Sequence, residues 1–84
     1  MKAIHKYFVA NFAESIVIPC NYIFRAAAIQ KGKMCVWAEV DPNSQDCVRR
    51  IVIKSTGSEI KDGSNYISTV FDDMYVWHLY EEVK

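Results

Sequence analysis

The sequence has no excess of charge of either sign. Ten Lys and Arg residues balance ten Asp and Glu residues over 84 positions. Tight non-specific binding to nucleic acid needs clustered positive charge that displaces counterions, and a DNA mimic needs the opposite excess. The balance therefore disfavours direct nucleic-acid binding. The closeness of Arg49, Arg50 and Lys54 in the sequence leaves a local basic patch open.

Long apolar runs are also missing. No stretch approaches the roughly 20 apolar residues that a membrane-spanning helix needs. Lys2, His5 and Lys6 precede an apolar run, but neither a long hydrophobic region nor a small-residue cleavage site follows. We therefore expect a soluble protein of the cytoplasm with no membrane partner.

The three cysteines (Cys20, Cys35 and Cys47) are odd in number and form no C-x-x-C pair. A secreted disulfide framework normally uses an even count, and zinc sites normally place two ligands within a short interval. The expectation is three reduced cysteines that act as small buried hydrophobic residues. No metal and no cofactor are predicted.

Apolar residues are abundant instead. The chain is 51% hydrophobic and 13% aromatic, and we expect it to form a single domain over residues 1–84. A domain of this size buries only about 60–65% of the surface of its unfolded chain. Some apolar side chains should therefore stay exposed as a partner surface, and self-association into homo-oligomers is a further expectation.

Short segments with β-forming residues alternate with turn residues, which predicts an all-β fold. We expect a small antiparallel sandwich or a partly open barrel of about six or seven short strands. Residues 21–30 could also form a helix capped by Asn21, and 74–83 has helical spacing as well. Strands are preferred for both, the last one with a frayed end near Val83. The expected strands are 3–10, 14–20, 22–30, 33–40, 47–55, 66–72 and 74–82.

Three local features refine this expectation. Lys31-Gly32 fits a two-residue hairpin turn, and an acidic turn is expected at Asp72-Asp73. The 33–40 segment is apolar on both faces, which is typical of a strand covered on both sides. Arg49 and Arg50 must point to opposite faces of their strand, so a solvated, charge-protected edge strand is preferred there over a basic nucleic-acid stripe.

Several motifs together resemble a family of small uncharacterised bacteriophage proteins. They are Q-K-G-K-M-C-V-W-A-E-V-D-P (30–42), T-G (56–57), Y-I-S-T (66–69) and V-W-H-L (76–79). The resemblance covers nearly the whole chain, but Ser55 and Ser68 replace two glycines of the family pattern, which leaves any role of those glycines in doubt. The family carries no assigned catalytic residues, so the resemblance implies a phage origin and no particular mechanism.

His78 is the most conspicuous candidate for chemistry. A catalytic histidine needs a nucleophile and an orienting carboxylate beside it. Cys35 or Cys47 could act as the nucleophile, and Asp72 or Glu81 could orient the ring, but no spacing requires this. We expect a half-buried structural histidine that is hydrogen-bonded to a neighbouring strand, and we expect no enzyme activity.

The loop after residue 54 is the best small-ligand candidate. Hydroxyls and a glycine amide at Thr56, Gly57 and Ser58, with Arg50 nearby, could hold a phosphate. The alternative is an ordinary turn whose hydroxyls bond local backbone groups.

The main functional hypothesis is a phage-encoded accessory protein that binds a host protein, for example an inhibitor of a bacterial defence system such as CRISPR. It rests on the resemblance, on the missing catalytic signature and on the surplus of apolar residues. The alternative is an oligomer that sequesters a nucleotide signal at the 56–58 loop, and a virion component is a weaker third. The expected partner-binding residues are exposed charges and aromatics: Asp72, Asp73, Tyr75, Tyr80 and Glu81.

Overall fold

The computed structural model describes residues 1–82, and within this range the chain is all-β, as expected. The strands lie close to the expected bounds, and the ambiguous 21–30 and 74–82 segments are both strands. The expected frayed end near Val83 lies outside the described residues. Within residues 1–82 there is no helix long and apolar enough to cross a membrane. The strands are β1 (Ala3–Phe8), β2 (Ala13–Pro19), β3 (Tyr22–Gln30), β4 (Lys33–Val40), β5 (Asp46–Ser55), β6 (Asn65–Asp72) and β7 (Tyr75–Glu82).

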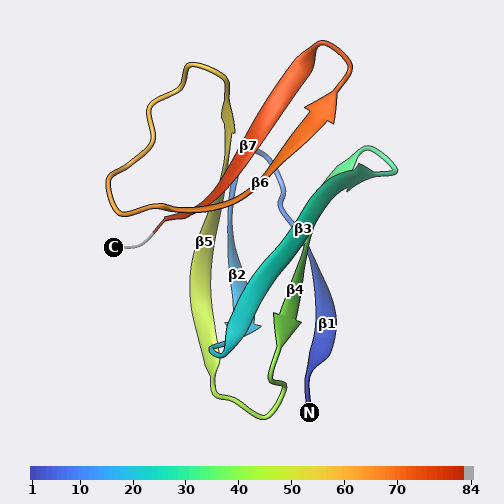
Figure 1. Cartoon of the computed structure of the whole chain (residues 1–84), viewed down its shortest axis with the longest axis vertical. Coiled ribbons are helices and arrows are strands. Elements are labelled where there is room, and N and C mark those ends of the chain that lie inside the picture. The colour runs from blue at the N-terminus through green and yellow to red at the C-terminus, as the bar shows by residue number, and fades with distance from the viewer. Residues whose placement is uncertain (83–84) are drawn as a thin grey trace.

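These strands form two antiparallel sheets that pack face to face without closing into a barrel (Figure 1). One sheet has the order β1-β4-β3 and the other has the order β2-β5-β7-β6. Because β5 lies between β2 and β7, it is a central strand, and the interpretation of Arg49 and Arg50 as part of an edge strand is wrong. The tips of the β3–β4 and β6–β7 hairpins lie toward the top of Figure 1, and the β4–β5 connection lies at the bottom.

The two tight hairpins follow local turn chemistry. Lys31 and Gly32 both have left-handed backbone conformations (φ 51° and 77°), which is the requirement of the type I′ turn expected there. In the second hairpin Asp72 pairs with Tyr75. The turn residues are therefore Asp73 and Met74, one position later than expected, and Asp73 takes the left-handed conformation (φ 50°), which Asp tolerates better than most residues.

The core lies between the sheets and follows the two-residue period of each strand. In β4 the side chains of Met34, Val36, Ala38 and Val40 enter it, as the alternation predicts. The opposite face of β4 is covered only in part, because Cys35 is fully buried whereas Trp37 is partly buried and the neighbouring side chain of Phe8 is exposed. The expectation of a strand covered on both sides therefore holds at Cys35 and only partly at Trp37. The fully buried large side chains are Ile18, Cys35, Val36, Val40, Ile51 and Leu79.

Candidate functional site

An apolar hollow of about 450 Å³ opens between the sheets at the end that carries the two hairpins. The segment from Val9 to Phe12 crosses from one sheet to the other above it. The Val9 amide donates to the Met34 carbonyl (3.0 Å) in the first sheet, and the Ile53 amide donates to the Phe12 carbonyl (2.8 Å) in the second. Asn11 makes the turn between them with φ 55°. These bonds hold the crossing segment in place, so the hollow beneath it is a fixed feature of the fold.

Apolar side chains from both sheets line this hollow. Its volume lies within the range of ordinary ligand pockets, which runs from about 300 to 1,000 Å³. The lining includes Phe8, Phe12, Ile29, Met34, Ile53 and Trp77.

A row of three aromatic rings extends from the mouth of the hollow onto the β6–β7 hairpin. The ring centroids of Phe12 and Trp77 are 5.7 Å apart, and those of Trp77 and Tyr75 are 5.6 Å apart with nearly parallel planes. Both outer rings face water, since Phe12 is 62% exposed and Tyr75 is 56% exposed. We call the hollow together with Phe12, Tyr75 and Trp77 the apolar end. Exposed aromatic side chains beside a preformed pocket are typical of the central part of a protein interface.

The family match covers the chain from residue 1 to residue 84. The chain belongs to the family described as a domain of unknown function, DUF7352. No curated protein and no solved structure matches it. Any functional argument must therefore come from the residues themselves.

The predicted partner-binding residues do not form one surface. Asp72, Asp73 and Tyr75 lie together in and beside the β6–β7 turn, next to the apolar end. Tyr80 is half-buried farther along β7, where its ring packs edge-on against that of Tyr66. Tyr80 lies five residues beyond Tyr75, which is roughly 17 Å along an extended strand. Glu81 is only 5% exposed, so the expectation that it is an exposed charge is wrong.

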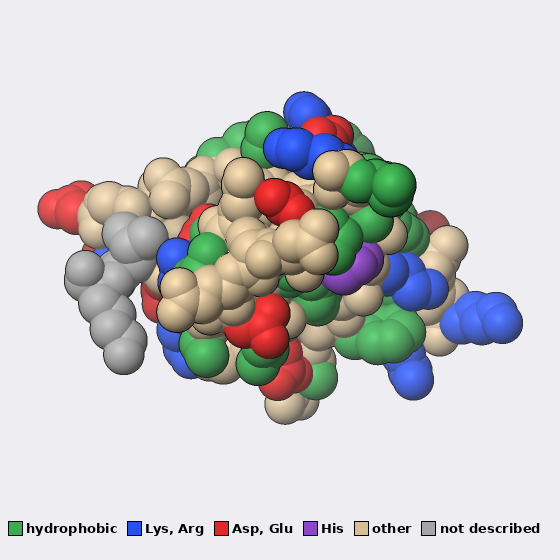
Figure 2. All heavy atoms as spheres, turned by 90° about the horizontal axis from the view of Figure 1, so that it is seen from below, with side chains coloured by type: hydrophobic (Ala, Val, Ile, Leu, Met, Phe, Trp, Pro, Cys, Tyr) green, Lys and Arg blue, Asp and Glu red, His purple; other side chains and the backbone are tan. Residues whose placement is uncertain are grey.

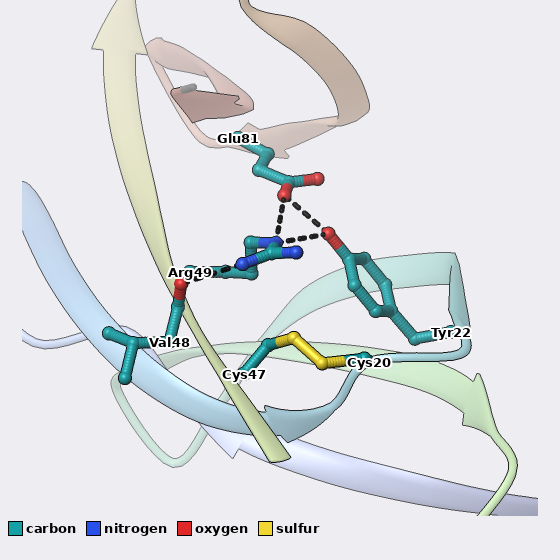
Figure 3. Close-up of polar contacts among 6 residues, drawn as sticks. All are labelled: Cys20, Tyr22, Cys47, Val48, Arg49 and Glu81. Carbon is teal, nitrogen blue, oxygen red and sulfur yellow. Dashed lines mark hydrogen bonds and ion pairs between the residues drawn. A yellow bond between two sulfur atoms is a disulfide. The ribbon is translucent and has the colours of Figure 1, made fainter. Parts of the chain in front are cut away.

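Glu81 belongs instead to a polar cluster that bridges the two sheets at the opposite end of the core (Figure 3). The Tyr22 hydroxyl on β3 donates to Glu81 Oε2 on β7. Arg49 Nε on β5 donates to the Tyr22 hydroxyl (3.0 Å) and lies 3.2 Å from the same carboxylate oxygen. A buried carboxylate would otherwise be costly, so this arrangement explains how Glu81 is accommodated. Burial raises the pKa of Tyr22 above its usual value of 10.0, and the hydrogen bond to Glu81 acts in the same direction.

A disulfide joins Cys20 and Cys47 beside this cluster (Figure 3). Cys20 directly follows β2, Cys47 is the second residue of β5, and their Cα atoms are 5.1 Å apart. The antiparallel pairing of β2 with β5 brings them together, because Ile18 is the register partner of Cys47. The expectation of three reduced cysteines is therefore wrong for this pair. Cys35 is a buried free cysteine, as expected.

The loop predicted to hold a phosphate bonds mainly to itself and to β7. The hydroxyls of Ser55 and Ser58 are 2.9 Å apart, and the Thr56 hydroxyl lies 3.0 Å from His78 Nε2. Gly57 has φ 94°, a conformation that favours glycine. Arg50 pairs with Glu82 (3.1 Å) in the middle of β5, roughly 17 Å of extended strand before Ser55. The structure thus separates Arg50 from Thr56, Gly57 and Ser58.

His78 lies on the outer face of β7 and bonds to neighbouring segments, as the structural interpretation predicted. Its Nε2 atom lies 3.0 Å from the Thr56 hydroxyl, and its Nδ1 atom lies 3.2 Å from the hydroxyl of Thr69 on β6. Thr69 in turn bonds to the Tyr66 hydroxyl (2.7 Å). One ring nitrogen therefore joins the 55–58 loop to β7, and the other joins β6 to β7.

Proposed function

We propose that this chain is a non-enzymatic binding protein that captures a protein of the bacterial cell through its apolar end. The observation that carries the proposal is the exposed row formed by Phe12, Trp77 and Tyr75 beside the apolar hollow. Aromatic side chains contribute most of the affinity in many interfaces when a partner covers them and excludes water.

The hairpin beside this surface favours a partner with a complementary positive charge. Asp72 and Asp73 precede Met74 and Tyr75 at the β6–β7 turn, and Met74 is almost fully exposed. An apolar centre with a charged rim matches the usual organisation of protein interfaces, in which the rim steers approach and the centre supplies affinity.

The biological setting follows from the resemblance to small bacteriophage proteins. We propose an accessory protein that a phage makes in the cytoplasm of its host and that inhibits a host protein, such as a component of a CRISPR or other defence system. The family match carries no function that bears on this setting. The partner must therefore be found by experiment.

The test is affinity capture from a bacterial lysate with three versions of the tagged protein, read by mass spectrometry. The first is the wild type, and the second carries Phe12→Ala and Tyr75→Ser. The third carries Val17→Ser and Val48→Ser, whose wild-type side chains are 61% and 64% exposed at the far end of the β2–β5 pair. This third version is a matched control, because it removes similarly exposed apolar side chains away from the apolar end.

We expect the wild type and the control to retain one stoichiometric host protein. The apolar-end variant should lose it, because an interface hot spot contributes about 2 kcal/mol or more, which is roughly 30-fold in affinity. Equal retention by all three versions would refute the apolar end as the contact surface. A nucleotide that co-purifies with no protein would instead favour the sequestration alternative.

A further inference from the structure

A second hollow, of about 590 Å³, lies at the outer side of the β1-β4-β3 sheet, and three lysines line it. Lys6 comes from β1, whereas Lys31 and Lys33 come from the β3–β4 hairpin. Phe8 and Gln30 complete the lining, and Phe8 and Lys33 also line the apolar hollow. In Figure 2, Lys and Arg side chains project from the right-hand side of the molecule with hydrophobic side chains beside them. We call these five residues the lysine hollow.

The three lysines form no ion pair with the described residues 1–82. The arginines differ, because each of the three has an acidic partner: Arg25 pairs with Glu39, Arg49 with Glu81 and Arg50 with Glu82. The basic patch considered at Arg49 and Arg50 is thus neutralised within the fold. Of the six lysines within residues 1–82, three line this one hollow, and such a cluster of unpaired positive charge suits an anionic ligand.

Aromatic surface adjoins this charge. The Lys6 ammonium lies 5.2 Å from the centroid of the Phe8 ring and 6.0 Å from that of Trp37, and the Lys33 ammonium lies 5.5 Å from the Phe8 centroid. Lys6 also donates to the side-chain oxygen of Gln30 (3.0 Å). On β3 the register partner of Trp37 is Ala26, a small residue that leaves the sheet surface open beside the ring.

We propose that the lysine hollow binds single-stranded nucleic acid. The ammonium groups of Lys6, Lys31 and Lys33 would contact backbone phosphates. A base would then stack on the Phe8 ring in place of the Lys6 and Lys33 ammonium groups that lie over it. Lysines beside exposed rings on an open sheet face are the combination that binds unpaired strands, because the charge follows the backbone and the rings accept any base. An acidic peptide would use the charge but would leave the aromatic surface unused. This proposal replaces the expectation, drawn from net charge, that direct nucleic-acid binding is disfavoured.

Fluorescence anisotropy with a labelled oligo-dT and a labelled oligo-U, repeated across salt concentrations, tests the proposal. Three phosphate contacts predict a slope of about −2.1 for the logarithm of affinity against the logarithm of salt concentration, so affinity should fall about 20-fold between about 50 and 200 mM salt. Replacing Lys31→Gln and Lys33→Gln should reduce the slope to about −0.7. The matched control is Lys54→Gln with Lys61→Gln, which removes the same charge elsewhere and should keep the full slope.

The aromatic part is tested with Phe8→Ala and with an abasic oligonucleotide of equal length. Each should lower the affinity roughly 5- to 150-fold, the effect of one lost base–aromatic stack. Thermal melting of each variant shows that it is folded. The proposal would be overturned if the wild type did not bind either oligonucleotide at low salt, or if the Lys54 and Lys61 changes weakened binding as much as the Lys31 and Lys33 changes. It would also be overturned if the wild type bound the abasic strand, or polyglutamate as an acidic peptide, as tightly as the intact oligonucleotide. Because the apolar-end variant keeps all three lysines, failure here is distinguishable from failure of host-protein capture.

Discussion

The Cys20–Cys47 disulfide should supply a large share of the stability of this small domain, and reduction removes it without changing the sequence. The two cysteines are 27 residues apart, and the segment between them contains β3 and β4, which belong to the other sheet. The disulfide therefore restricts the unfolded chain around the segment that forms β3 and β4 of the other sheet.

The size of the effect follows from the length of the closed loop. For a loop of 27 residues, the chain-entropy relation gives about 12 cal/mol/K, or about 3.5 kcal/mol at 25 °C. A domain of 84 residues is expected to have a total stability of only about 4–13 kcal/mol. Reduction should therefore remove a quarter or more of it. If the proposed cytoplasmic location is correct, the protein would work mainly in this weaker, reduced form.

Urea unfolding followed by tryptophan fluorescence, with and without reductant, measures the effect directly. With a urea dependence of about 1.2 kcal/mol/M, expected for a small domain, the midpoint should fall by about 3 M on reduction. The variant with Cys20→Ser and Cys47→Ser should behave like the reduced wild type in both conditions. The control Cys35→Ala removes only the buried free thiol, so it should keep the full response to reductant. Equal midpoints for oxidised and reduced wild type would refute the reasoning.

Three further predictions concern named side chains. The Glu81→Ala change should lower the unfolding free energy by about 3 kcal/mol, because it leaves Arg49 without its buried carboxylate. The control Glu82→Ala removes the carboxylate of the more exposed pair with Arg50. It should cost less than about 1 kcal/mol in the same urea titration. The raised pKa of Tyr22 means that the folded state keeps a proton that the unfolded state loses above pH 10. The unfolding free energy should therefore fall as the pH rises from 10 toward the folded-state pKa. The Tyr22→Phe variant should show a smaller fall between pH 9 and 11. An unchanged fall would assign the effect to Tyr7, whose pKa is also raised, mainly by burial. Charge reversal with Asp72→Lys and Asp73→Lys should weaken host-protein capture by slowing association while the thermal midpoint changes little; unchanged capture would exclude the hairpin from the contact.

Alternation along single strands made most of the secondary structure predictable. β3 and β4 have the expected bounds, and the Lys31-Gly32 turn has the expected conformation. Each of these features depends on neighbours in the sequence, because the period of side chains and the φ preference of glycine act locally. The same alternation also indicates where two members of the polar cluster lie. It places Glu81 on the inner face with Trp77 and Leu79, and it places Arg49 there with Ile51.

Pairing between distant segments could not be predicted in this way. No local pattern assigns β5 to the centre of its sheet, and the Cys20–Cys47 bond depends on that assignment. The lysine hollow likewise combines β1 with the β3–β4 hairpin. Net charge is insensitive to such clustering, since it sums over the whole chain. The row of Phe12, Trp77 and Tyr75 joins a connection between sheets to a hairpin, and only the packing of the two sheets brings the rings together.

The Tyr22–Arg49–Glu81 cluster joins the two sheets at one end, and the Val9–Phe12 segment, bonded to Met34 and Ile53, joins them at the other end beside the hollow. Because the sheets are joined at both ends, they cannot separate at the mouth of the hollow without breaking these bonds. The Ile53 amide, which bonds to the crossing segment, should therefore exchange with solvent as slowly as the amides near Arg49 and Glu81. A hollow held at a fixed width selects the apolar groups that enter it by their size.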